Sequence, residues 1–256
     1  MAKLEVELIP ALSDNYIYLA HEPDSGETAV VDPAEAKPVL EAAKAKGWTI
    51  THILNTHHHG DHTGGNKEVQ QATGAPIVGP KYDEGRIPGI QVALEEGDSY
   101  ALGNAAAKVF FTPGHTRGHI CFWFEDADVL FSGDTLFALG CGRLFEGSPA
   151  DMWESLQKLR RLPDTCLVFC GHEYTQTNAR CARDCDPENA KLKAYADRIQ
   201  QQRAAGKPTI PAQLGEEKAC NPFLRADDPG LAQAIGMAGA APVEVFAAVR
   251  EKRNGY

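Results

Sequence analysis

The feature that most constrains this chain is the segment Thr56-His57-His58-His59-Gly60-Asp61-His62, which gathers metal-binding side-chain types within six positions. On an extended backbone alternate side chains point to the same side, so His57 and His59 face one way and His58 faces the other. The glycine that follows lets the backbone turn sharply before the aspartate and the last histidine. The two pairs can therefore face two neighbouring points. This pattern predicts a hydrolytic site for two metal ions rather than a polar loop that happens to contain histidine.

Charge and composition exclude several other classes of protein. The formal net charge of the 256 residues is −10, whereas a nucleic-acid-binding surface needs a basic excess. No apolar run is long enough to cross a membrane, and the N-terminus lacks a long apolar signal segment. We therefore expect a cytoplasmic protein with no membrane or nucleic-acid partner. The odd count of 7 cysteines favours reduced thiols over a disulfide framework.

The first two thirds of the chain alternate between strand and helix patterns. Apolar or alternating runs predict strands at Leu4–Leu12, Asn15–Ala20, Thr28–Asp32, Ile50–Asn55, Val109–Thr112, Ile120–Phe124, Val129–Ser132 and Leu167–Cys170. Helical patterns cover Ala34–Lys46, His62–Thr73 and Pro149–Leu162. The early strands follow one another closely, which indicates antiparallel hairpins beside βα units. The mixture predicts sheets packed between helices.

The last third of the chain has a different character. From about Tyr174 onward the pattern is helical, with stretches at Asn189–Ala205, Leu231–Met237 and Val243–Arg253 and no expected strand. We therefore predict two domains, residues 1–173 and a helical domain of residues 174–256. A basic cluster near the C-terminus, Arg250, Lys252 and Arg253, is either a solvated helix face or a seat for an anionic small ligand.

Three further ligand-type residues occupy one recurring local setting. His115, Asp134 and His172 each come directly after a glycine at the carboxyl end of an apolar run, and His57 likewise follows a predicted strand. Strand ends that converge on one edge of a sheet are a usual place for active sites. Each residue alone could be a capped turn or a buried, satisfied histidine. The repetition of the pattern indicates a shared site.

This order of motifs resembles the metallo-β-lactamase superfamily, in which Thr-His-x-His-x-Asp-His is followed by Gly-His115, Gly-Asp134 and Gly-His172. Within it, the chain is most similar to the glyoxalase II family, the hydroxyacylglutathione hydrolases. The supporting segments are Thr112–His119, Ser132–Phe137, Gly140–Gly147, Gly171–Tyr174, Ile210–Lys218 and Asn221–Arg225. The resemblance covers nearly the whole chain. It implies a four-layer αβ/βα metallo-β-lactamase sandwich with a C-terminal α-helical domain that helps to bind glutathione.

The resemblance also implies a ligand set. His57, His59 and His115 would hold the first metal ion, Asp61, His62 and His172 the second, and Asp134 would bridge them. Imidazole and carboxylate ligands suit zinc, with iron or manganese as alternatives, and no thiolate selects among them. Asp61 and Asp134 are the residues to which we assign catalytic roles, Asp61 by orienting a hydroxide.

The implied reaction is hydrolysis of S-(2-hydroxyacyl)glutathione, chiefly S-D-lactoylglutathione, to D-lactate and glutathione, a step of methylglyoxal detoxification. A glutathione thiolate leaves readily because its thiol pKa is about 8.5, so no strong general acid is needed. Two other readings stay open at this point. One is a persulfide dioxygenase of the same fold with a single iron, and the other is a non-catalytic metal-binding module.

Family members bind glutathione through a basic and an aromatic residue near the Gly-Cys-Gly segment, through the tyrosine after the last histidine, and through a basic pair near the C-terminus. The matching residues here are Arg143, Phe145, Tyr174, Arg250 and Arg253. Phe145 lacks the hydroxyl that other members carry there. Lys252 competes with Arg253 for the last contact. We expect the protein to act as a monomer.

Three nearby features receive supporting roles. His119 is expected to support the site by hydrogen bonding rather than to bind metal. Cys141 has no histidine in its local motif to activate it, so a nucleophilic role is not expected. Gly64-Gly65 is expected to allow close packing under the metal-binding loop.

Overall fold

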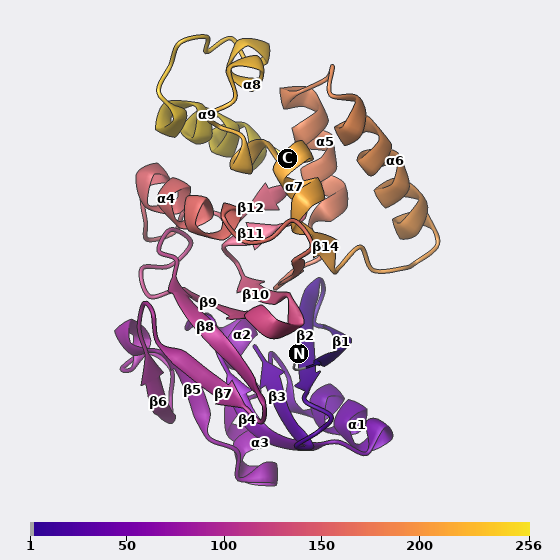
Figure 1. Cartoon of the computed structure of the whole chain (residues 1–256), viewed down its shortest axis with the longest axis vertical. Coiled ribbons are helices and arrows are strands. Elements are labelled where there is room, and N and C mark those ends of the chain that lie inside the picture. Colours follow the sequence, from indigo (N-terminus) through magenta and orange to yellow (C-terminus); the bar gives the residue numbers. More distant parts are fainter. Residues whose placement is uncertain (1–2) are drawn as a thin grey trace. The chain divides into compact units, whose positions relative to one another are not determined.

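The computed structural model describes residues 3–256, which divide into two compact units (Figure 1). Of the described residues, unit 1 comprises 3–111 and 117–133, and unit 2 comprises 112–116 and 134–256. The short segment Thr112–Thr116 therefore packs with the second unit although the first unit surrounds it in sequence. The domain boundary between residues 173 and 174 stays a prediction.

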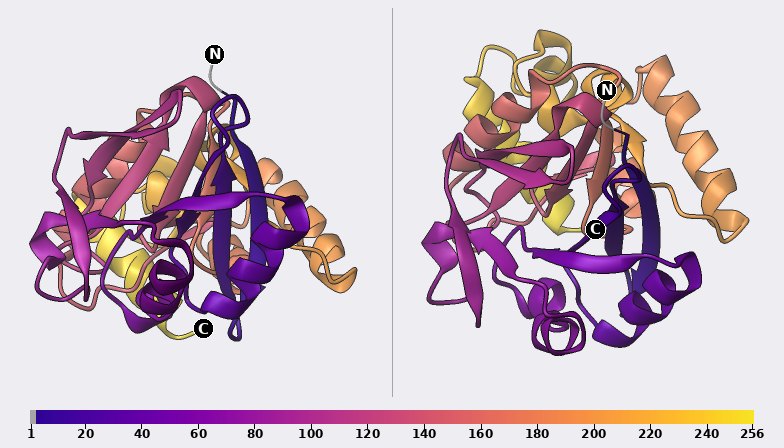
Figure 2. Two further views of the ribbon diagram at one scale, coloured as in Figure 1. Left: turned by 90° about the horizontal axis from the view of Figure 1, so that it is seen from below. Right: turned by 60° about the horizontal axis from the view of Figure 1, so that its bottom comes forward.

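The first sheet of unit 1 contains six strands in the order β1-β2-β3-β4-β5-β6. Its strands are β1 Glu5–Ala11, β2 Asn15–His21, β3 Glu27–Val31, β4 Thr49–Leu54, β5 Ile77–Pro80 and β6 Ile90–Leu94. The first three pair antiparallel, and β1 and β2 form the long hairpin drawn in indigo in Figure 2. From β3 to β6 all pairings are parallel. The predicted combination of hairpins with βα units is confirmed.

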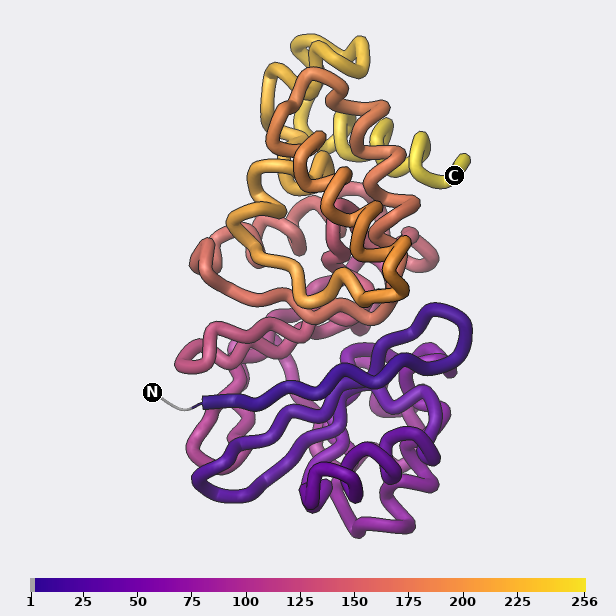
Figure 3. Tube along the Cα trace, turned by 90° about the vertical axis from the view of Figure 1, so that its right-hand side faces the viewer, coloured from indigo at the N-terminus to yellow at the C-terminus, as the bar shows by residue number. Residues whose placement is uncertain are grey.

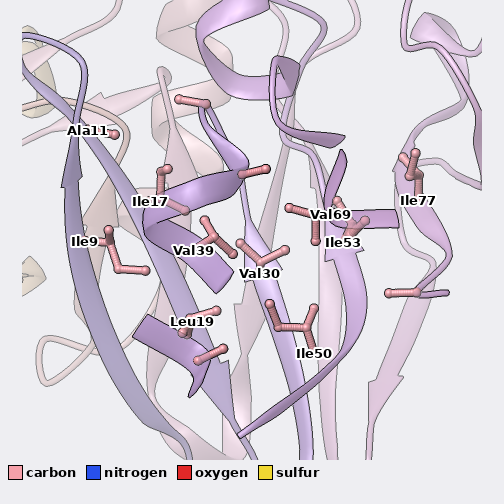
Figure 4. Packing of buried hydrophobic residues seen from close by; sticks show 14 of the residues in the cluster. Ile9, Ala11, Ile17, Leu19, Val30, Val39, Ile50, Ile53, Val69 and Ile77 are labelled. Carbon is pink, nitrogen blue, oxygen red and sulfur yellow. The ribbon is translucent and has the colours of Figure 1, made fainter. Parts of the chain in front are cut away.

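Three helices connect the parallel strands: α1 Ala36–Lys46, α2 Gly60–Thr63 and α3 Asn66–Thr73. Val39 of α1 and Val69 of α3 are fully buried in a core with Ile17, Val30 and Ile53 of the sheet (Figure 4). Burying a side chain of this size stabilises the fold by about 1.5–3 kcal/mol. Helices α1 and α3 therefore cover one face of the first sheet.

A second group of strands lies against the other face of this sheet. It runs antiparallel in the order β7-β8-β9-β10, with β7 Ser99–Leu102, β8 Ala105–Phe111, β9 Ile120–Phe124 and β10 Val129–Gly133. Tyr18 of β2 meets Phe131 of β10 with ring centroids 5.6 Å apart, an ordinary aromatic packing distance. Unit 1 is thus a helix layer and two strand layers around apolar cores.

Unit 2 begins with short strands and one amphipathic helix. Its early elements are β11 Leu136–Phe137, β12 Gly140–Cys141, α4 Pro149–Arg160 and β13 Leu167–Cys170. Ser148 caps α4 by accepting a hydrogen bond from the amide of Asp151, whose carboxylate accepts one from the Ser148 amide. Proline follows at the first helical position. This capping box explains why α4 begins at the predicted residue.

The rest of unit 2 is mainly helical. Its elements are α5 Thr175–Cys185, α6 Ala190–Ala204, β14 Ala212–Gln213, α7 Leu214–Cys220, α8 Pro229–Ala234 and α9 Pro242–Asn254. Helices α5 and α6 lie side by side (Figure 3). They share a buried core with Leu139 that includes Ala179, Leu192 and Tyr195. Single-turn 3₁₀ helices occur at Lys81–Asp83, Glu125–Ala127 and Pro222–Leu224.

Two predictions about elements were wrong. The stretch His62–Thr73 is not one helix, because the backbone at Gly64 and Gly65 breaks it into α2 and α3. The expectation of no strand after Tyr174 is corrected by β14, which pairs antiparallel with β13 through Gln213 opposite Leu167 and Ala212 opposite Val168. A strand of two residues carries no periodicity, so the sequence pattern had no signal for it.

Two expectations from composition can be compared with the described residues. All seven cysteines are buried and none forms a disulfide within residues 3–256, which confirms the prediction of free thiols. Among the same residues, no helix has both the length and the apolar character needed to span a bilayer.

Candidate metal centre

In unit 1, Asp32 organises the loop that carries the histidine motif. It follows β3 and adopts a left-handed backbone conformation with φ of 50°. Its Oδ1 accepts a hydrogen bond from the Thr56 amide at 2.8 Å, and its Oδ2 accepts one from the Thr56 hydroxyl at 2.7 Å. Because β3 and β4 are parallel neighbours, their carboxyl ends lie together. This pairing lets Asp32 fix the start of the motif.

Asp32 also orients His62. Its Oδ2 lies 3.1 Å from Nδ1 of His62, while Nε2 of the same ring lies 3.5 Å from Oδ2 of Asp61. A carboxylate only accepts hydrogen bonds, so Nδ1 carries the proton and Nε2 of the neutral ring is a bare acceptor. A bare nitrogen that faces a carboxylate needs a cation between them, either a second proton or a metal ion. Sequence reasoning missed Asp32 because its contact with Thr56 spans 24 positions and forms only when β3 and β4 pair.

His57 and His59 converge as their spacing predicts. Nε2 of His57 lies 3.1 Å from Nδ1 of His59, and the His57 ring is fully buried. Two nitrogens that bind one zinc ion in a tetrahedral site lie about 3.3 Å apart, given Zn–N bonds of about 2.0–2.1 Å. The observed spacing therefore fits a shared ion. Side-chain atoms of Asp32, His57 and His62, one from each residue, also lie within 4.8 Å of one another, with Asp32 facing Nδ1 of His62.

The side chain of Asp61 is held by a residue that sequence reasoning did not single out. Asn15, at the start of β2, donates hydrogen bonds to Oδ2 of Asp61 at 3.0 Å and to its carbonyl oxygen at 3.1 Å. Asn15 is buried, whereas the Asp61 side chain is 40% exposed. Asn15 therefore fixes a carboxylate that remains open to a small molecule.

Further contacts around this loop involve His58, His119 and Gly64. Nδ1 of His58 lies 3.1 Å from Oδ2 of Asp83, although its ring still contacts the edge of His59 with centroids 4.8 Å apart. The buried His119 ring stacks on His57 with centroids 5.0 Å apart. A side chain on Gly64 would come within 2.7 Å of the Ala34 carbonyl oxygen, so close packing under the loop is confirmed.

Unit 2 supplies a second group of ligand-type side chains. Nε2 of His115 and Nε2 of His172 each lie 3.3 Å from the same oxygen, Oδ2 of Asp134. Nδ1 of His115 lies 2.8 Å from the carbonyl oxygen of Arg143, so this nitrogen is the donor and Nε2 is bare. The bare nitrogen again faces a carboxylate. One carboxylate oxygen shared by two imidazoles is the arrangement expected of a bridging ligand.

Both units therefore present the donors that a divalent cation prefers. Imidazole nitrogens and carboxylate oxygens are ligands for zinc, iron and manganese, and their orientation by outer partners such as Asp32 is typical of metal sites. All seven predicted ligands lie in one or the other of these two groups. The chemistry of the donors fits a divalent metal site.

Arg143, Arg250 and Arg253 form a cluster of positive charge in unit 2. Burial lowers the pKa of Arg253 first, and the charges of Arg250 and Arg143 lower it further. Arg250 is only 6% exposed and donates to the carbonyl oxygen of Cys141 at 2.7 Å. Arg253 donates through Nε to Asn178 at 2.7 Å. Like charges are costly to hold together, so this cluster suits an anionic ligand.

Lys252 has a different environment. Its Nζ donates to the carbonyl oxygen of Asp184 at 2.6 Å, a bond that closes the end of α5. The ammonium group of Lys252 therefore has a backbone partner, whereas Arg253 interacts with Arg250 and Arg143. Which of Lys252 and Arg253 contacts glutathione stays a prediction.

The aromatic residues named from the sequence line the same group. The Tyr174 ring stacks on His172 with centroids 4.7 Å apart and an interplanar angle of 3°. Phe145 is 61% exposed, and its ring lies 5.2 Å from that of His115. Cys141 is buried, and this burial raises the pKa of its thiol to about 11. The thiol is therefore protonated at neutral pH, which agrees with the expectation that it is not a nucleophile.

Comparison with known sequences places the chain in a class. The profile of the metallo-β-lactamase superfamily matches residues 11–172, and the profile of the hydroxyacylglutathione hydrolase C-terminus matches residues 173–256. The chain belongs to the metallo-β-lactamase superfamily and has its fold. Solved structures agree. ETHE1 from Myxococcus xanthus superposes with a TM-score of 0.67 at 23% identity, with 99% of each chain covered. The B3 metallo-β-lactamase BLEG-1 gives 0.67 at 23% identity, covering 86% of this chain and 99% of that one.

Within that superfamily the chain belongs to the hydroxyacylglutathione hydrolase family. A hydroxyacylglutathione hydrolase of Rhodospirillum rubrum is 56% identical over 256 residues, with 100% of both chains covered. One from Methylococcus capsulatus is 55% identical over 253 residues, with 99% of both covered. The resemblance seen in the ligand motif and in the C-terminal extension is confirmed.

Proposed function

We propose that this chain hydrolyses S-(2-hydroxyacyl)glutathione thioesters, chiefly S-D-lactoylglutathione, to D-lactate and glutathione. The observation that carries the proposal is the match of its full length to hydroxyacylglutathione hydrolases, together with donor groups that fit divalent ions. Relatives with that name favour the hydrolase over a persulfide dioxygenase or a non-catalytic metal-binding module. We keep the predictions of a monomer that acts in the cytoplasm on a small-molecule thioester.

We propose that two divalent ions, zinc in the first instance, are held by the seven predicted ligands. His57, His59 and His115 would bind one ion, and Asp61, His62 and His172 the other. Asp134 would bridge them, which is supported by the equal distances of 3.3 Å from its Oδ2 to two imidazoles. When bound, such ions would supply hydroxide at neutral pH and polarise the thioester carbonyl.

The chain's own residues would position the reactants. Asp61 would accept a hydrogen bond from the attacking water, and Asn15 supports this role by fixing one oxygen of that carboxylate. Asp32 would keep the proton of His62 on Nδ1, and the Arg143 carbonyl would do the same for His115. Both rings would then offer Nε2 as a lone-pair donor.

Substrate binding would use the arginine cluster of unit 2. We propose that Arg143 and Arg253 contact the carboxylates of glutathione, with Tyr174 and Phe145 against its apolar parts. Arg250 would add positive charge and hold the backbone beside Arg143, because its guanidinium is nearly buried and donates to the Cys141 and Gly142 carbonyl oxygens. We also propose that Arg250 contacts glutathione directly.

The test is an assay of S-D-lactoylglutathione with metal content measured on the same sample. The expected result is loss of the thioester ultraviolet absorbance that depends on bound metal, with D-lactate and free thiol formed in equal amounts. Oxygen uptake with glutathione persulfide and no thioesterase activity would establish the dioxygenase instead. Bound metal with neither activity would indicate the binding module.

A further inference from the structure

A buried hairpin in unit 2 connects two parts of the proposed site. Strands β11 and β12 pair through Leu136 with Cys141 and Phe137 with Gly140, so the connecting turn is Ala138-Leu139. Asp134 comes two residues before the start of β11, and Arg143 comes two residues after the end of β12. An isolated two-stranded hairpin is marginally stable in water. The surroundings must therefore hold this one in place.

The turn itself is conformationally unfavourable. Leu139 has φ of 54°, a left-handed conformation in which a residue with a side chain is uncommon. Its side chain is fully buried in the core of α5 and α6, which offsets that cost. A turn held against its own preference needs partners for its backbone groups as well.

Side chains from the helical part of unit 2 supply these partners. Asn178 of α5 donates to the Ala138 carbonyl at 2.9 Å, and Arg250 of α9 donates to the Cys141 carbonyl at 2.7 Å. Asn221, directly after α7, donates to the carbonyl oxygens of Phe137 and Gly140, both at 3.1 Å. All three are donors that bind carbonyl groups. In these contacts all three side chains act as donors, so the Leu139 amide needs a different partner.

Glu217 of α7 is the acceptor in this set. Its Oε2 accepts a hydrogen bond from the Leu139 amide at 2.7 Å and one from Asn221 at 2.9 Å. Its Oε1 accepts one from the Tyr195 hydroxyl at 2.9 Å. The carboxylate is 0% exposed, and no salt bridge with a cation is found for it among residues 3–256. A buried carboxylate held only by neutral donors is costly, so its retention here calls for an explanation.

We propose that Glu217 is a positioning residue for the glutathione-binding segment, which it places by holding the amide of Leu139 in the turn between β11 and β12. The link to the site is short. The backbone beyond β12 passes Gly142, where an added side chain would lie 2.0 Å from the Asp134 carbonyl oxygen. It then reaches Arg143, whose carbonyl oxygen orients His115. We expect a shift of the turn to displace both Asp134 and Arg143, because Gly142 packs too closely against Asp134 for the backbone to adjust between them.

The electrostatic setting supports the assignment. Burial raises the pKa of Glu217 to about 7, and the hydrogen bonds from Leu139, Tyr195 and Asn221 oppose that shift. The other titratable groups around it are Tyr195, Glu216 and Cys220, and Arg198 lies over the Tyr195 ring. Glu216 forms an ion pair with Arg198, and neither of these residues belongs to the hairpin. Within this group, Tyr195 and Cys220 pack in the same core as Leu139, and Glu217 is the member that accepts a hydrogen bond from the turn.

The role in glutathione binding rests on the proposed function, so the test needs a readout that does not. We would compare Glu217→Leu, which removes the acceptor at similar volume, with Glu217→Gln, whose amide oxygen can still accept from Leu139. Glu216→Leu is the matched control, since it makes the same change at the neighbouring position of α7. The first readout is amide hydrogen exchange of residues 136–143. The second is the affinity for glutathione by calorimetry on the metal-loaded protein.

We expect Glu217→Leu to speed exchange in residues 136–143 by about tenfold or more relative to α4, because an amide left without its acceptor loses local stability. Glutathione affinity should fall by about tenfold, with KM for the thioester raised more than kcat is lowered. Glu217→Gln should restore both, and Glu216→Leu should resemble the wild type. If Glu217→Leu does not fold, Tyr195→Phe, which removes one donor, should give a smaller rise in the same segment.

Unchanged exchange in residues 136–143 of a folded Glu217→Leu or Tyr195→Phe protein would overturn the proposal. An equal rise throughout unit 2 would also overturn it, because it would indicate a general loss of stability. If the wild type bound glutathione but did not hydrolyse the thioester, the proposed function would fail while the exchange and binding results still decided the role of Glu217.

Discussion

The carbonyl oxygen of Arg143 lies 2.8 Å from Nδ1 of His115. A residue proposed to bind the substrate thereby sets the tautomer of a residue proposed to bind metal. We therefore expect the position of the segment after β12 to affect both ligand affinity and metal affinity. The two functions cannot be separated by moving this backbone.

Asp134 is the proposed ligand whose loss should affect metal binding most. Asp134→Ala removes the oxygen that lies 3.3 Å from both His115 and His172. We expect about one ion per chain in place of two, and turnover lowered at least about 100-fold, since losing an outer partner of a ligand already costs about 10–100-fold. Metal analysis and the thioester assay on the same sample measure both. The exposed Asp126→Ala is the control, and two ions at full occupancy in the Asp134 variant would refute the bridging role.

We expect Asp32 to affect metal affinity through His62, without contacting the substrate. Asp32→Asn keeps the shape but replaces one of the oxygens that bind Thr56 and His62 with a donor. We expect metal affinity to fall by about 10–100-fold, the usual effect of losing an outer partner. Competition with a chelator of known affinity measures this. Wild-type affinity in the variant would show that His62 does not depend on Asp32.

Arg253 and Lys252 should differ although they are adjacent. Arg253→Ala removes a cation from the cluster with Arg250 and Arg143, so KM should rise by about tenfold with kcat nearly unchanged, as for loss of a charged hydrogen bond to a ligand. Lys252→Ala breaks only the bond to the Asp184 carbonyl and should leave KM within about twofold. A larger effect from Lys252 than from Arg253 would reverse the assignment.

Glu217 should make the protein less stable as the pH rises. Its folded-state pKa of about 7 lies above the unfolded value of 4.5, so the folded state binds more protons between these values. Stability is therefore highest below pH 4.5 with respect to this group and falls as the pH rises to 7, by at most about 3 kcal/mol. Denaturant unfolding of wild type and Glu217→Gln at several pH values isolates this group by difference. Parallel curves would contradict the shift.

The sequence was sufficient where a function depends on neighbours along the chain. The spacing of His57 and His59 predicts their convergence because an extended backbone alternates its side chains, and the two nitrogens are 3.1 Å apart. Helix α4 starts as predicted because its capping residues are adjacent in sequence. The family resemblance additionally predicted ligands that lie more than 100 residues apart in the sequence.

The sequence was insufficient where a role depends on tertiary contacts. Asn15 reaches Asp61 across 46 positions, and Glu217 reaches Leu139 across 78. Glu217 lies in the segment Ile210–Lys218 that supported the family resemblance, but the pattern gave neither residue a role, because both contacts form only once β2 and α7 are in place. The break between α2 and α3 was also missed, because the contact of Gly64 and Gly65 with the backbone near Ala34 outweighs a helical pattern.

The most direct test of the account measures metal content and turnover of S-D-lactoylglutathione on one preparation, before and after chelation. We predict two ions per chain in the active protein, activity lost on chelation, and activity restored by adding a divalent metal. Fully loaded protein that leaves the thioester intact would contradict the central claim, as would unchanged hydrolysis after complete removal of metal.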